Sequence, residues 1–463
     1  MNQRVRFDPE LVRRYDIAGP RYTSYPTALQ FHEGFDTEAY RRYVNQSNDE
    51  LIPSPLSLYV HLPFCRSLCY YCGCTKKVTR HESQAVAYLD LLCREIRMRG
   101  GLFDRDRKVT QLHLGGGTPT YFNDKQLHQL VTSLQQSFRF STSKDREFSI
   151  EVDPRTVDGE RLARLAELGF NRISLGVQDT DPEVQKAVNR IQDSDATLEM
   201  VSASRALGFN SVSIDLIYGL PLQTTASFGK TLNMVITARP DRLAVYNYAH
   251  MPHIFRSQRL INEDDIPSPQ TKLELMELTI QTLTDAGYIY IGMDHFALPD
   301  DELSIAQRQG DLHRNFQGYS TRSECDLIGL GVSAIGKIGD CFAQNLKEIP
   351  HWSAAVAEGV LPLWRGLSLN AEDCLRRDVI EAIMCHGRVD FTDFDRRFDF
   401  DFNEHFAAEI HQLEILAGDG LLELDEEGFC VTSEGRLLLR AVAMVFDEYL
   451  QAASKQPRFS RVI

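Results

Sequence analysis

Four cysteines lie close together in the stretch YVHLPFCRSLCYYCGCTK, residues 59–76. Cys65, Cys69 and Cys72 have the spacing C-x3-C-x2-C, and Cys74 follows two positions later. A [4Fe–4S] cubane is normally held by four thiolates, so three would leave one iron without a protein ligand. Such an open iron can chelate the amino and carboxylate groups of S-adenosylmethionine and pass an electron to its sulfonium. The spacing therefore predicts a redox-active iron–sulfur site.

A zinc site is the alternative for the same thiols. Tetrahedral zinc sites usually combine two separated cysteine pairs. The six other cysteines occur singly, at 93, 325, 341, 374, 385 and 430, and we expect them to behave as small buried hydrophobic residues. Four neighbouring thiols could still enclose a zinc ion, so the spacing alone leaves this alternative open.

Composition and charge narrow the class of protein. The chain has 463 residues, of which 43% are hydrophobic, and a net charge of -15. The length predicts one large domain with one or two smaller ones. The acidic balance argues against a broad nucleic-acid surface, although a basic pocket for a small anionic substrate remains compatible with it. No apolar run is long enough to span a bilayer, and the N-terminus does not resemble a secretory signal. We therefore expect a cytoplasmic protein, in which clustered thiols favour metal binding or catalysis over disulfides.

Short strand patterns alternate with helical ones from about residue 56 onward. The candidate strands are LSLYVHLP, KVTQLHLGGG, EFSIEVDP, NRISLGVQ, SVSIDLIYG and RLAVYNYAHM, with YIYIGMDHFA as a plausible seventh. This alternation predicts an α/β fold built from parallel βαβ units. Both an open doubly wound sheet and a full or partial barrel fit the pattern.

Polar and glycine residues gather where these strands end. They are Gly115 to Thr118, Glu151, Asp153, Gln178, Asp215, Tyr248 and His250. The carboxyl ends of parallel strands are where both βα barrels and open sheets build their sites. Glu151 and Asp215 lie on otherwise apolar strands, and each must meet a cation or hydroxyl donors there. A salt bridge inside the barrel would satisfy them equally well.

The two ends of the chain follow different patterns. Residues 1–55 contain GPRYTSYPTA, which is too rich in proline and aromatic residues for a regular helix. Beyond about residue 365 come helices, a hairpin in DGLLELDEEGFCVT and a long helix in GRLLLRAVAMVFDEYLQ. This order is similar to a winged helix, for which we expect packing rather than DNA binding. GLGVSA at 329–334 matches only the loosest dinucleotide fingerprint and has no clear following βαβ unit, so we reject a Rossmann site.

Motifs along nearly the whole chain carry a family resemblance. They are GPRYTSYPTA, YVHLPFCRSLCYYCGC, LHLGGGTPTY, SIEVDPR, ISLGVQD, YNYAHMP, HRNFQGY, GVSAIG, and NIDLIYGLP with Ser213 in place of the asparagine. In these motifs the sequence resembles the oxygen-independent coproporphyrinogen III oxidases of the radical S-adenosylmethionine superfamily. The resemblance implies a partial (β/α)6 TIM-like barrel over residues 56–365. It also implies an N-terminal extension, 1–55, that contributes to the active site and a mostly helical C-terminal domain, 366–463.

The resemblance also implies roles for particular residues. Cys65, Cys69 and Cys72 would ligate a [4Fe–4S] cluster, and two S-adenosylmethionine molecules would bind beside it. The molecule on the cluster would contact Tyr59, Gly116, Glu151 and Ile335. The second would contact Tyr71, Gly117, Thr118, Gln178, Arg190, Asp215 and Ala249. Cys74, with Tyr59, is a candidate catalytic residue, because the C-x-C ending distinguishes these enzymes from haem-binding paralogues.

The implied reaction is the conversion of two propionate side chains of coproporphyrinogen III to vinyl groups by a 5′-deoxyadenosyl radical, without oxygen. A substrate with four propionates needs cations, for which Arg21, His313 and Arg314 are candidates and Arg458 and Arg461 weaker ones. We also expect an electron donor such as flavodoxin or ferredoxin, an unidentified electron acceptor and a monomeric protein. A haem-binding delivery protein with the same fold is the alternative, against which the C-x-C ending and GPRYTSYPTA argue.

Overall fold

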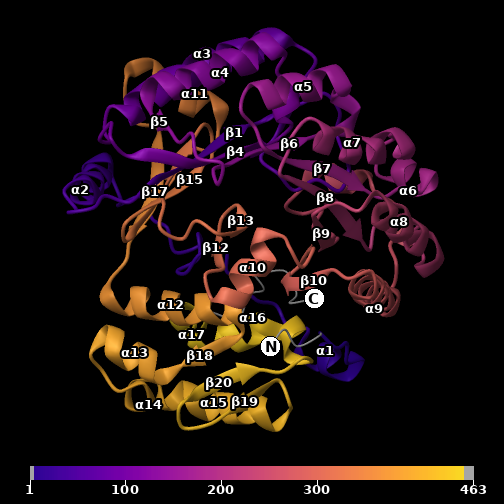
Figure 1. The fold of residues 1–463 in the computed structure, drawn as a ribbon, viewed down its shortest axis with the longest axis vertical. Helices are drawn as coiled ribbons and strands as arrows, with labels where there is room; N and C mark the ends of the chain where they lie inside the picture. The colour runs from indigo at the N-terminus through magenta and orange to yellow at the C-terminus, as the bar shows by residue number, and fades with distance from the viewer. Residues whose placement is uncertain (1–4, 453–463) are drawn as a thin grey trace. The chain divides into compact units, whose positions relative to one another are not determined.

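The computed structural model describes residues 5–452, whose contacts divide them into two units (Figure 1). The barrel unit consists of residues 31–268 and 324–368, and the terminal unit of residues 5–30, 269–323 and 369–452. Within the described residues, no helix combines the length and apolar character that a membrane crossing requires. Arg458 and Arg461, two weak substrate candidates, lie outside the described residues.

Six parallel strands form the first part of the barrel unit. They are β1 (Leu56–Leu62), β4 (Lys108–Gly116), β6 (Glu147–Val152), β7 (Arg172–Gln178), β8 (Ser211–Tyr218) and β9 (Arg242–Asn247). Each pairs in parallel with the next along the chain. At least one helix lies between consecutive strands, so every connection is a βαβ crossover. The predicted partial (β/α)6 barrel is thereby confirmed.

Amphipathic helices cover the outer face of these strands (Figure 1). They are α3 (Glu82–Gly100), α4 (Asp124–Ser137), α5 (Gly159–Glu167), α6 (Pro182–Ala187), α7 (Ser194–Ala206) and α8 (Thr225–Ala238). Local sequence fixes their starts. The side chain of Asn123 accepts a hydrogen bond from the backbone N–H of Gln126, and the side chain of Gln126 accepts one from the backbone N–H of Asn123, so α4 begins with a capping box. Leu127, Leu130 and Leu134 then recur at helical spacing and are buried.

The sheet continues beyond β1 with strands from much later in the chain. β14 (Asp326–Leu330) pairs with β1 in parallel, and β15 (Ile335–Ile338), β16 (Cys341–Asn345) and β17 (Leu363–Ser368) follow in antiparallel order. Helix α11 (Ile349–Glu358) connects the last two. The segment GLGVSA forms the turn from β14 into an antiparallel strand. It therefore lacks the following helix that a dinucleotide site requires, which confirms the rejection of that site.

The terminal unit begins with α1 (Pro9–Tyr15) and includes a segment that the strand pattern had placed in the barrel. YIYIGMDHFA forms the antiparallel hairpin β10 (Ile289–Gly292) and β11 (His295–Ala297), so it is not one longer strand. Its Ile291 packs with Leu303 of α10 (Glu302–Gln309) and Cys385 of α12 (Ala371–His386). Residues 269–323 therefore group with the C-terminal residues, unlike the expected division at 365. α2 (Thr37–Asn48), from the expected N-terminal extension, belongs to the barrel unit.

The C-terminal part contains the predicted hairpin, β19 (Leu422–Leu424) and β20 (Gly428–Val431). With β18 (Arg388–Asp390) and helices α13 (Phe391–Phe398), α14 (Phe402–His405) and α15 (Ala407–Gly418), it gives a helical fold with one small sheet. The predicted long helix is wrong, because α16 (Leu439–Ala443) and α17 (Glu448–Ala452) are separate. Asp447 lies between them in an extended conformation, and its carboxylate accepts hydrogen bonds from the N–H groups of Tyr449 and Leu450. An aspartate in that position caps a new helix.

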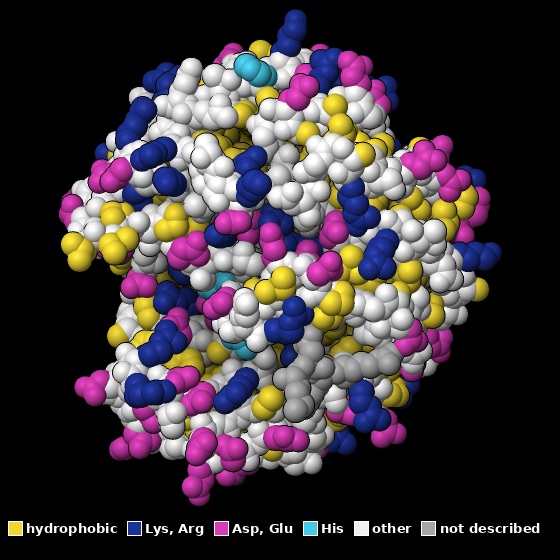
Figure 2. Space-filling view, viewed as in Figure 1, with side chains coloured by type: hydrophobic (Ala, Val, Ile, Leu, Met, Phe, Trp, Pro, Cys, Tyr) yellow, Lys and Arg dark blue, Asp and Glu magenta, His cyan; other side chains and the backbone are white. Residues whose placement is uncertain are grey.

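Charges of both signs are interspersed on the face shown in Figure 2, where Lys and Arg alternate with Asp and Glu. The described residues on this face form no wide region of positive charge.

Candidate active site

The cysteine loop leaves the carboxyl end of β1 through a short parallel pair, β2 (Phe64–Cys65) and β3 (Lys77–Val78). Phe64 anchors its start, because the ring is buried against Tyr88, Tyr121 and Phe122 with centroid distances of 5.5–5.8 Å. The loop therefore starts and ends at one fixed place beside the barrel strands.

Side chains from elsewhere in the barrel unit hold the loop's carbonyl groups. The Nε2 of Gln258 donates to the carbonyls of Tyr71 and Ala249, at 3.0 and 3.2 Å. Ser257 Oγ donates to the Cys72 carbonyl at 3.1 Å. Gln258 is only 2% exposed, so losing these bonds would leave buried polar groups unpaired. Sequence reasoning missed both residues, which lie in a segment without a recognisable motif.

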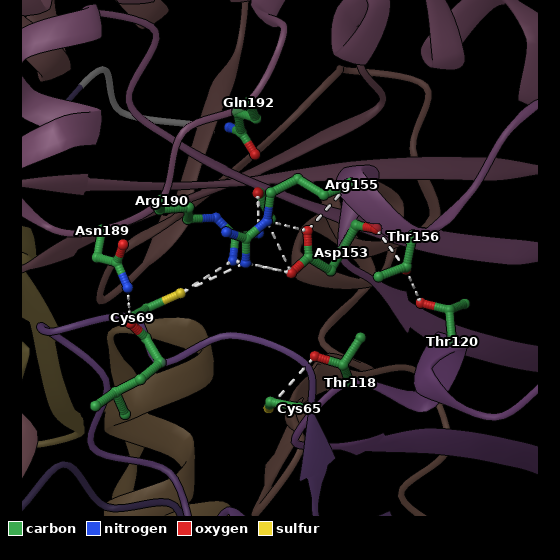
Figure 3. A network of polar contacts seen from close by, with 12 residues as sticks. Cys65, Cys69, Thr118, Thr120, Asp153, Arg155, Thr156, Asn189, Arg190 and Gln192 are labelled. Carbon is green, nitrogen blue, oxygen red and sulfur yellow. Dashed lines mark hydrogen bonds and ion pairs between the residues drawn. The ribbon is translucent and has the colours of Figure 1, made fainter. Parts of the chain in front are cut away.

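The cysteine sulfurs face hydrogen-bond donors (Figure 3). Arg190 Nη1 lies 3.5 Å and Arg155 Nη2 3.7 Å from the Sγ of Cys69, and Thr118 Oγ1 lies 3.4 Å from the Sγ of Cys65. Asp153 bridges the two arginines, with its Oδ2 at 2.7 Å from Arg155 Nη2 and 3.4 Å from Arg190 Nη1. Burial alone would raise the pKa of the Asp153 carboxyl, but the hydrogen bond from Arg155 and the charge of Arg190 hold it below its usual value. Two permanent cations therefore lie beside Cys69.

This donor set fits a cluster of negative thiolates and sulfides. Hydrogen bonds and charge around the sulfurs are what the protein uses to hold and tune such clusters. The buried Nε of Arg190 and Oε1 of Gln192 have no hydrogen-bond partner within residues 5–452, so polar capacity remains for a ligand. In the same residues, no three His, Cys, Asp or Glu side chains converge as a single metal ion requires.

A second polar chain begins at Tyr59. Its hydroxyl donates to His61 Nδ1 at 3.0 Å, because His61 Nε2 is committed to donating to the Thr75 carbonyl at 3.0 Å. Burial lowers the pKa of His61, which keeps the imidazole neutral at physiological pH. The Tyr59 ring also stacks on His113, with centroids 5.8 Å apart. The hydrogen bond to His61 and the stacking on His113 thus hold the Tyr59 side chain in one position.

Glu151 lies next to this chain at the end of β6. Its Oε1 is 3.0 Å from His113 Nε2, and its Oε2 accepts a hydrogen bond from the Gly116 N–H at 3.1 Å. Burial alone would raise the pKa of Glu151, but the His113 and Gly116 hydrogen bonds hold it below its usual value. The side chain is therefore an anchored carboxylate, suited to accept from ammonium or hydroxyl donors.

The turn after β4 brings backbone close to the cysteine loop. The N–H groups of Gly117 and Thr118 donate to the carbonyls of Leu62 and Phe64, each at 2.9 Å. Gly116 has φ +109°, which side chains rarely adopt, and a Cβ there would lie 2.5 Å from the His61 ring. The GGGTP segment is therefore a close-approach turn, as the sequence predicts.

Cys74 extends over the same region. Its exposed side chain hydrogen-bonds with Cys72, and it is close enough to Tyr59 and Glu151 to influence the pKa of the tyrosine and to be influenced by the glutamate. The hydrogen bond from Cys74 lowers the pKa of Cys72, since it stabilises the thiolate. Cys74 therefore shares the electrostatic surroundings of Tyr59 and Glu151.

The remaining cofactor candidates lie at neighbouring strand ends. Tyr71 contacts Cys69 and packs against an apolar cluster that includes Val188 and Tyr248. Gln178 ends β7 with φ +67°, at an irregularity in the pairing of β7 with β8. Ala249 follows β9 and offers its carbonyl to Gln258. Each lies in the barrel unit, as do all the cluster cysteines.

Ile335 is positioned by a buried network that sequence reasoning missed. The Tyr88 hydroxyl donates to the His61 carbonyl at 2.8 Å and accepts from the Val332 N–H at 3.0 Å. Glu95, also on α3, accepts from the Gly331 N–H at 2.8 Å. Its carboxylate further accepts from Asn345 and Trp352, at 2.7 and 3.0 Å. α3 therefore holds the turn that leads into Ile335.

Asp215, on β8, has a carboxyl group that resists ionisation. Burial and the nearby negative Glu151 raise its pKa to about 7, while a hydrogen bond from Ser174 at 3.1 Å partly opposes the shift. The folded protein thus keeps a proton that the unfolded chain releases above its ordinary pKa, near 3.9. The stronger binding of this proton by the folded protein stabilises the fold fully below about pH 3.9, and this stabilisation is lost as the pH rises through about 7.

We therefore expect Asp215→Asn to stabilise the cofactor-free protein at pH 8 by on the order of 2–4 kcal/mol, and by much less at pH 5. Urea unfolding midpoints of both proteins, measured from pH 5 to 8, check this. A wild-type minus variant difference that does not change with pH would contradict the raised pKa.

The substrate candidates lie in the terminal unit. Arg21 forms an ion pair with Asp294, and His313 Nδ1 forms one with Glu381. Arg314 is 9% exposed, and its guanidinium lies 4.6 Å from the centre of the Tyr319 ring. The three candidates thus differ in their partners: Arg21 and His313 have carboxylate partners, and Arg314 stacks on an aromatic ring.

Comparisons with known proteins agree with this geometry. The model of the radical SAM superfamily matches residues 59–235, and that of the HemN C-terminal domain matches residues 369–438. The chain is 50% identical to the oxygen-independent coproporphyrinogen III oxidase of Escherichia coli K12, over 100% of this chain and 99% of that protein. It is 43% identical to the same-named protein of Synechocystis, over 99% and 98%.

A solved structure extends the match to three dimensions. The structure described as coproporphyrinogen III oxidase (HemN) from Escherichia coli, a radical SAM enzyme, has a TM-score of 0.92 and 50% sequence identity. The match covers 96% of this chain and all of that one. With identity this high over the full length, the chain belongs to the family of oxygen-independent coproporphyrinogen III oxidases.

Proposed function

We propose that this protein converts coproporphyrinogen III to protoporphyrinogen IX by oxidative decarboxylation of two propionate side chains, without oxygen, in haem biosynthesis. Its relatives over the full length are named for this oxidase activity. The observation that carries the proposal is the cysteine loop at the carboxyl ends of the barrel strands, with the Cys69 sulfur facing Arg190 and Arg155. The protein is thus an oxidoreductase of the radical SAM type.

The radical SAM family uses a [4Fe–4S] cluster and S-adenosylmethionine. We infer that Cys65, Cys69 and Cys72 hold the cluster and leave one iron for the cofactor. When bound, these groups supply the 5′-deoxyadenosyl radical that removes a hydrogen atom from a propionate side chain. The chain's own residues orient the cofactor and the substrate and exclude water, as in other cofactor enzymes.

The residues around Glu151 form the proposed site of the cofactor on the cluster. The anchored carboxylate of Glu151 accepts from its ammonium or ribose hydroxyl groups. Gly116 allows close approach of the backbone, and Tyr59 and Ile335 would supply further contacts. His61 remains neutral and keeps the Tyr59 ring in place.

A second S-adenosylmethionine is part of the proposal, since two propionates are decarboxylated. Its candidate contacts are Tyr71, Gly117, Thr118, Gln178, Arg190, Asp215 and Ala249. Arg190 has limited freedom for this role, because Nη1 and Nη2 already bond with Asp153 and the Gly176 carbonyl. Its unpartnered Nε is the atom that remains for a ligand.

An electron donor must reach the cluster, and we propose a flavodoxin or ferredoxin acting on a monomer in the cytoplasm. Exposed Arg66, Lys77 and Arg80 flank the cysteine loop. A local group of cations on an otherwise acidic protein attracts an acidic electron carrier and orients its approach.

The proposed function is tested with anaerobically purified protein reconstituted with iron and sulfide. It is incubated with S-adenosylmethionine, a reductant, coproporphyrinogen III and a cell extract that supplies an electron acceptor. We expect protoporphyrin, separated by chromatography after oxidation, only when S-adenosylmethionine is present. A protein that holds its cluster and binds haem stoichiometrically, but forms no protoporphyrin, would instead be a haem-delivery protein.

A further inference from the structure

The turn that follows β6 presents Arg155 to the cysteine loop. Pro154, Arg155 and Thr156 form the short 3-10 helix η2 (Pro154–Thr156), which Asp153 caps by accepting from the Arg155 N–H at 3.1 Å. The Asp153 carboxylate also accepts from the guanidinium, with Oδ1 at 2.9 Å from Nε and Oδ2 at 2.7 Å from Nη2. Two parallel hydrogen bonds of this kind fix the plane of a guanidinium. Arg155 is therefore aligned toward the Cys69 sulfur, which lies 3.7 Å from Nη2 (Figure 3).

The backbone holds Cys69 in place from the opposite direction. Asn189 Nδ2 donates to the Leu68 carbonyl at 2.7 Å, and the Tyr70 N–H donates to the Val188 carbonyl at 3.0 Å. The residues on both sides of Cys69 are thus bound to the turn that follows α6. Since both the sulfur and the guanidinium are held, the distance between them is set by the fold of the barrel unit.

The charges beside Cys69 come from three side chains. Arg155 and Arg190 both donate to its sulfur, and Asp153 lies between the two guanidinium groups. The Asp153 and Arg155 side chains are only 10% and 21% exposed, so solvent screens their charges weakly. Removing the cation of Arg155 and removing the anion of Asp153 must therefore change the electrostatic potential at Cys69 in opposite directions.

We propose that Arg155, aligned by Asp153, raises the reduction potential of the iron–sulfur cluster that Cys69 ligates. This rests on the proposed function, because it takes Cys69 to be a cluster ligand. Reduction by one electron adds one negative charge to the cluster and its thiolates. A cation within hydrogen-bonding distance of a ligand sulfur stabilises the reduced form more than the oxidised form.

The two side chains then have distinct roles in the same site. Arg155 acts through the Cys69 sulfur and transfers neither an electron nor a proton itself, so it is a positioning residue. Asp153 fixes the guanidinium but also offsets part of its charge. Together they would set how strong an electron donor must be to reduce the cluster.

The test is an anaerobic redox titration of the full-length, iron-reconstituted protein without S-adenosylmethionine, followed by the EPR signal of the reduced cluster. We expect Arg155→Gln to lower the equilibrium constant for reduction about 10-fold, which is a midpoint lower by about 59 mV for a one-electron couple. Asp153→Asn is expected to raise the midpoint, because asparagine still accepts from Arg155 but carries no charge. Arg155→Lys keeps the positive charge and should shift the midpoint less than Arg155→Gln does.

Arg164→Gln is the matched control. Arg164 lies on α5 in the same unit, is 48% exposed and pairs with Asp124, so its loss should leave the midpoint at the wild-type value. A purely structural role for Arg155 would lower the iron content without shifting the midpoint of the remaining cluster. Equal midpoints in wild type and Arg155→Gln, or shifts in the same direction in Arg155→Gln and Asp153→Asn, would overturn the proposal. If Arg155→Gln holds no cluster, Asp153→Asn decides: a higher midpoint supports the proposal, and an unchanged or lower one overturns it.

Failure of the proposed function would look different. Wild type that holds a cluster with the expected opposite shifts, but forms no protoporphyrin, would keep the role of Arg155 and reject the oxidase reaction. Wild type that forms protoporphyrin, with a midpoint indifferent to both substitutions, would keep the reaction and reject the role of Arg155.

Discussion

Cys69→Ser is expected to abolish protoporphyrin formation and to remove most of the bound iron. Cys69 is 8% exposed, and its sulfur is the one that faces both Arg190 and Arg155. A serine hydroxyl does not supply the thiolate that ligates iron. Loss of an outer-shell partner typically costs 10- to 100-fold, so loss of a direct ligand should exceed about 100-fold. Iron and sulfide content, the EPR spectrum of the reduced protein and turnover are measured together.

Cys93→Ser is the matched control. Cys93 is a buried cysteine on α3 in the same unit, without a role in the cysteine loop. We expect it to keep its iron content and activity. A Cys69→Ser protein with wild-type iron content and turnover would reject the ligand assignment.

Gly117→Ala is expected to weaken S-adenosylmethionine binding by more than about 100-fold. A Cβ at this position would lie 2.7 Å from the Pro63 carbonyl carbon and 2.9 Å from both the Leu62 oxygen and the Phe64 nitrogen. All three are backbone atoms next to the cysteine loop, so none can turn aside as a flexible side chain does. The turn after β4 must therefore move away from the loop, and misplacement by about 1 Å near reacting groups can cost 100-fold.

Gly159→Ala controls for the loss of a glycine. A Cβ at Gly159, in the first turn of α5, meets no atom within 4 Å. Equilibrium dialysis with labelled S-adenosylmethionine compares both variants with wild type. If Gly117→Ala bound the cofactor as Gly159→Ala does, the GGGTP turn would have no close contact with it.

The parts of the fold that sequence could predict are those with local causes. Strand and helix alternation follows from side-chain periodicity, and it correctly gave the six parallel strands. The cysteine spacing and the GGGTP turn are likewise short-range signals. Both place chemistry directly after a strand, and the structure has Cys69 in the loop that follows β1 and Gly117 in the turn that follows β4.

The parts that sequence missed depend on distant contacts. Gln258 and Tyr88 look ordinary in their own segments, and only the folded chain brings them to the carbonyls of Tyr71 and His61. YIYIGMDHFA has the composition of one strand, but the chain turns back at residues 293–294 and forms the hairpin β10–β11, whose Ile291 packs against Cys385. The predicted last helix breaks at Asp447, whose carboxylate also accepts from the Tyr22 hydroxyl, almost the whole chain away.

The position of β1 has a consequence for how the chain matures. One edge of β1 pairs with β4, which follows soon in the sequence, but the other pairs with β14, where Leu56 is in register with Asp326. During synthesis β1 remains an open edge until β14 leaves the ribosome, and open edges invite wrong pairing. The Tyr88 hydroxyl, which donates to the His61 carbonyl, likewise cannot accept from the Val332 N–H until that residue has been made. Iron delivered before that moment would meet thiols on an unfinished scaffold, so cluster assembly belongs after β14 and Val332 have left the ribosome.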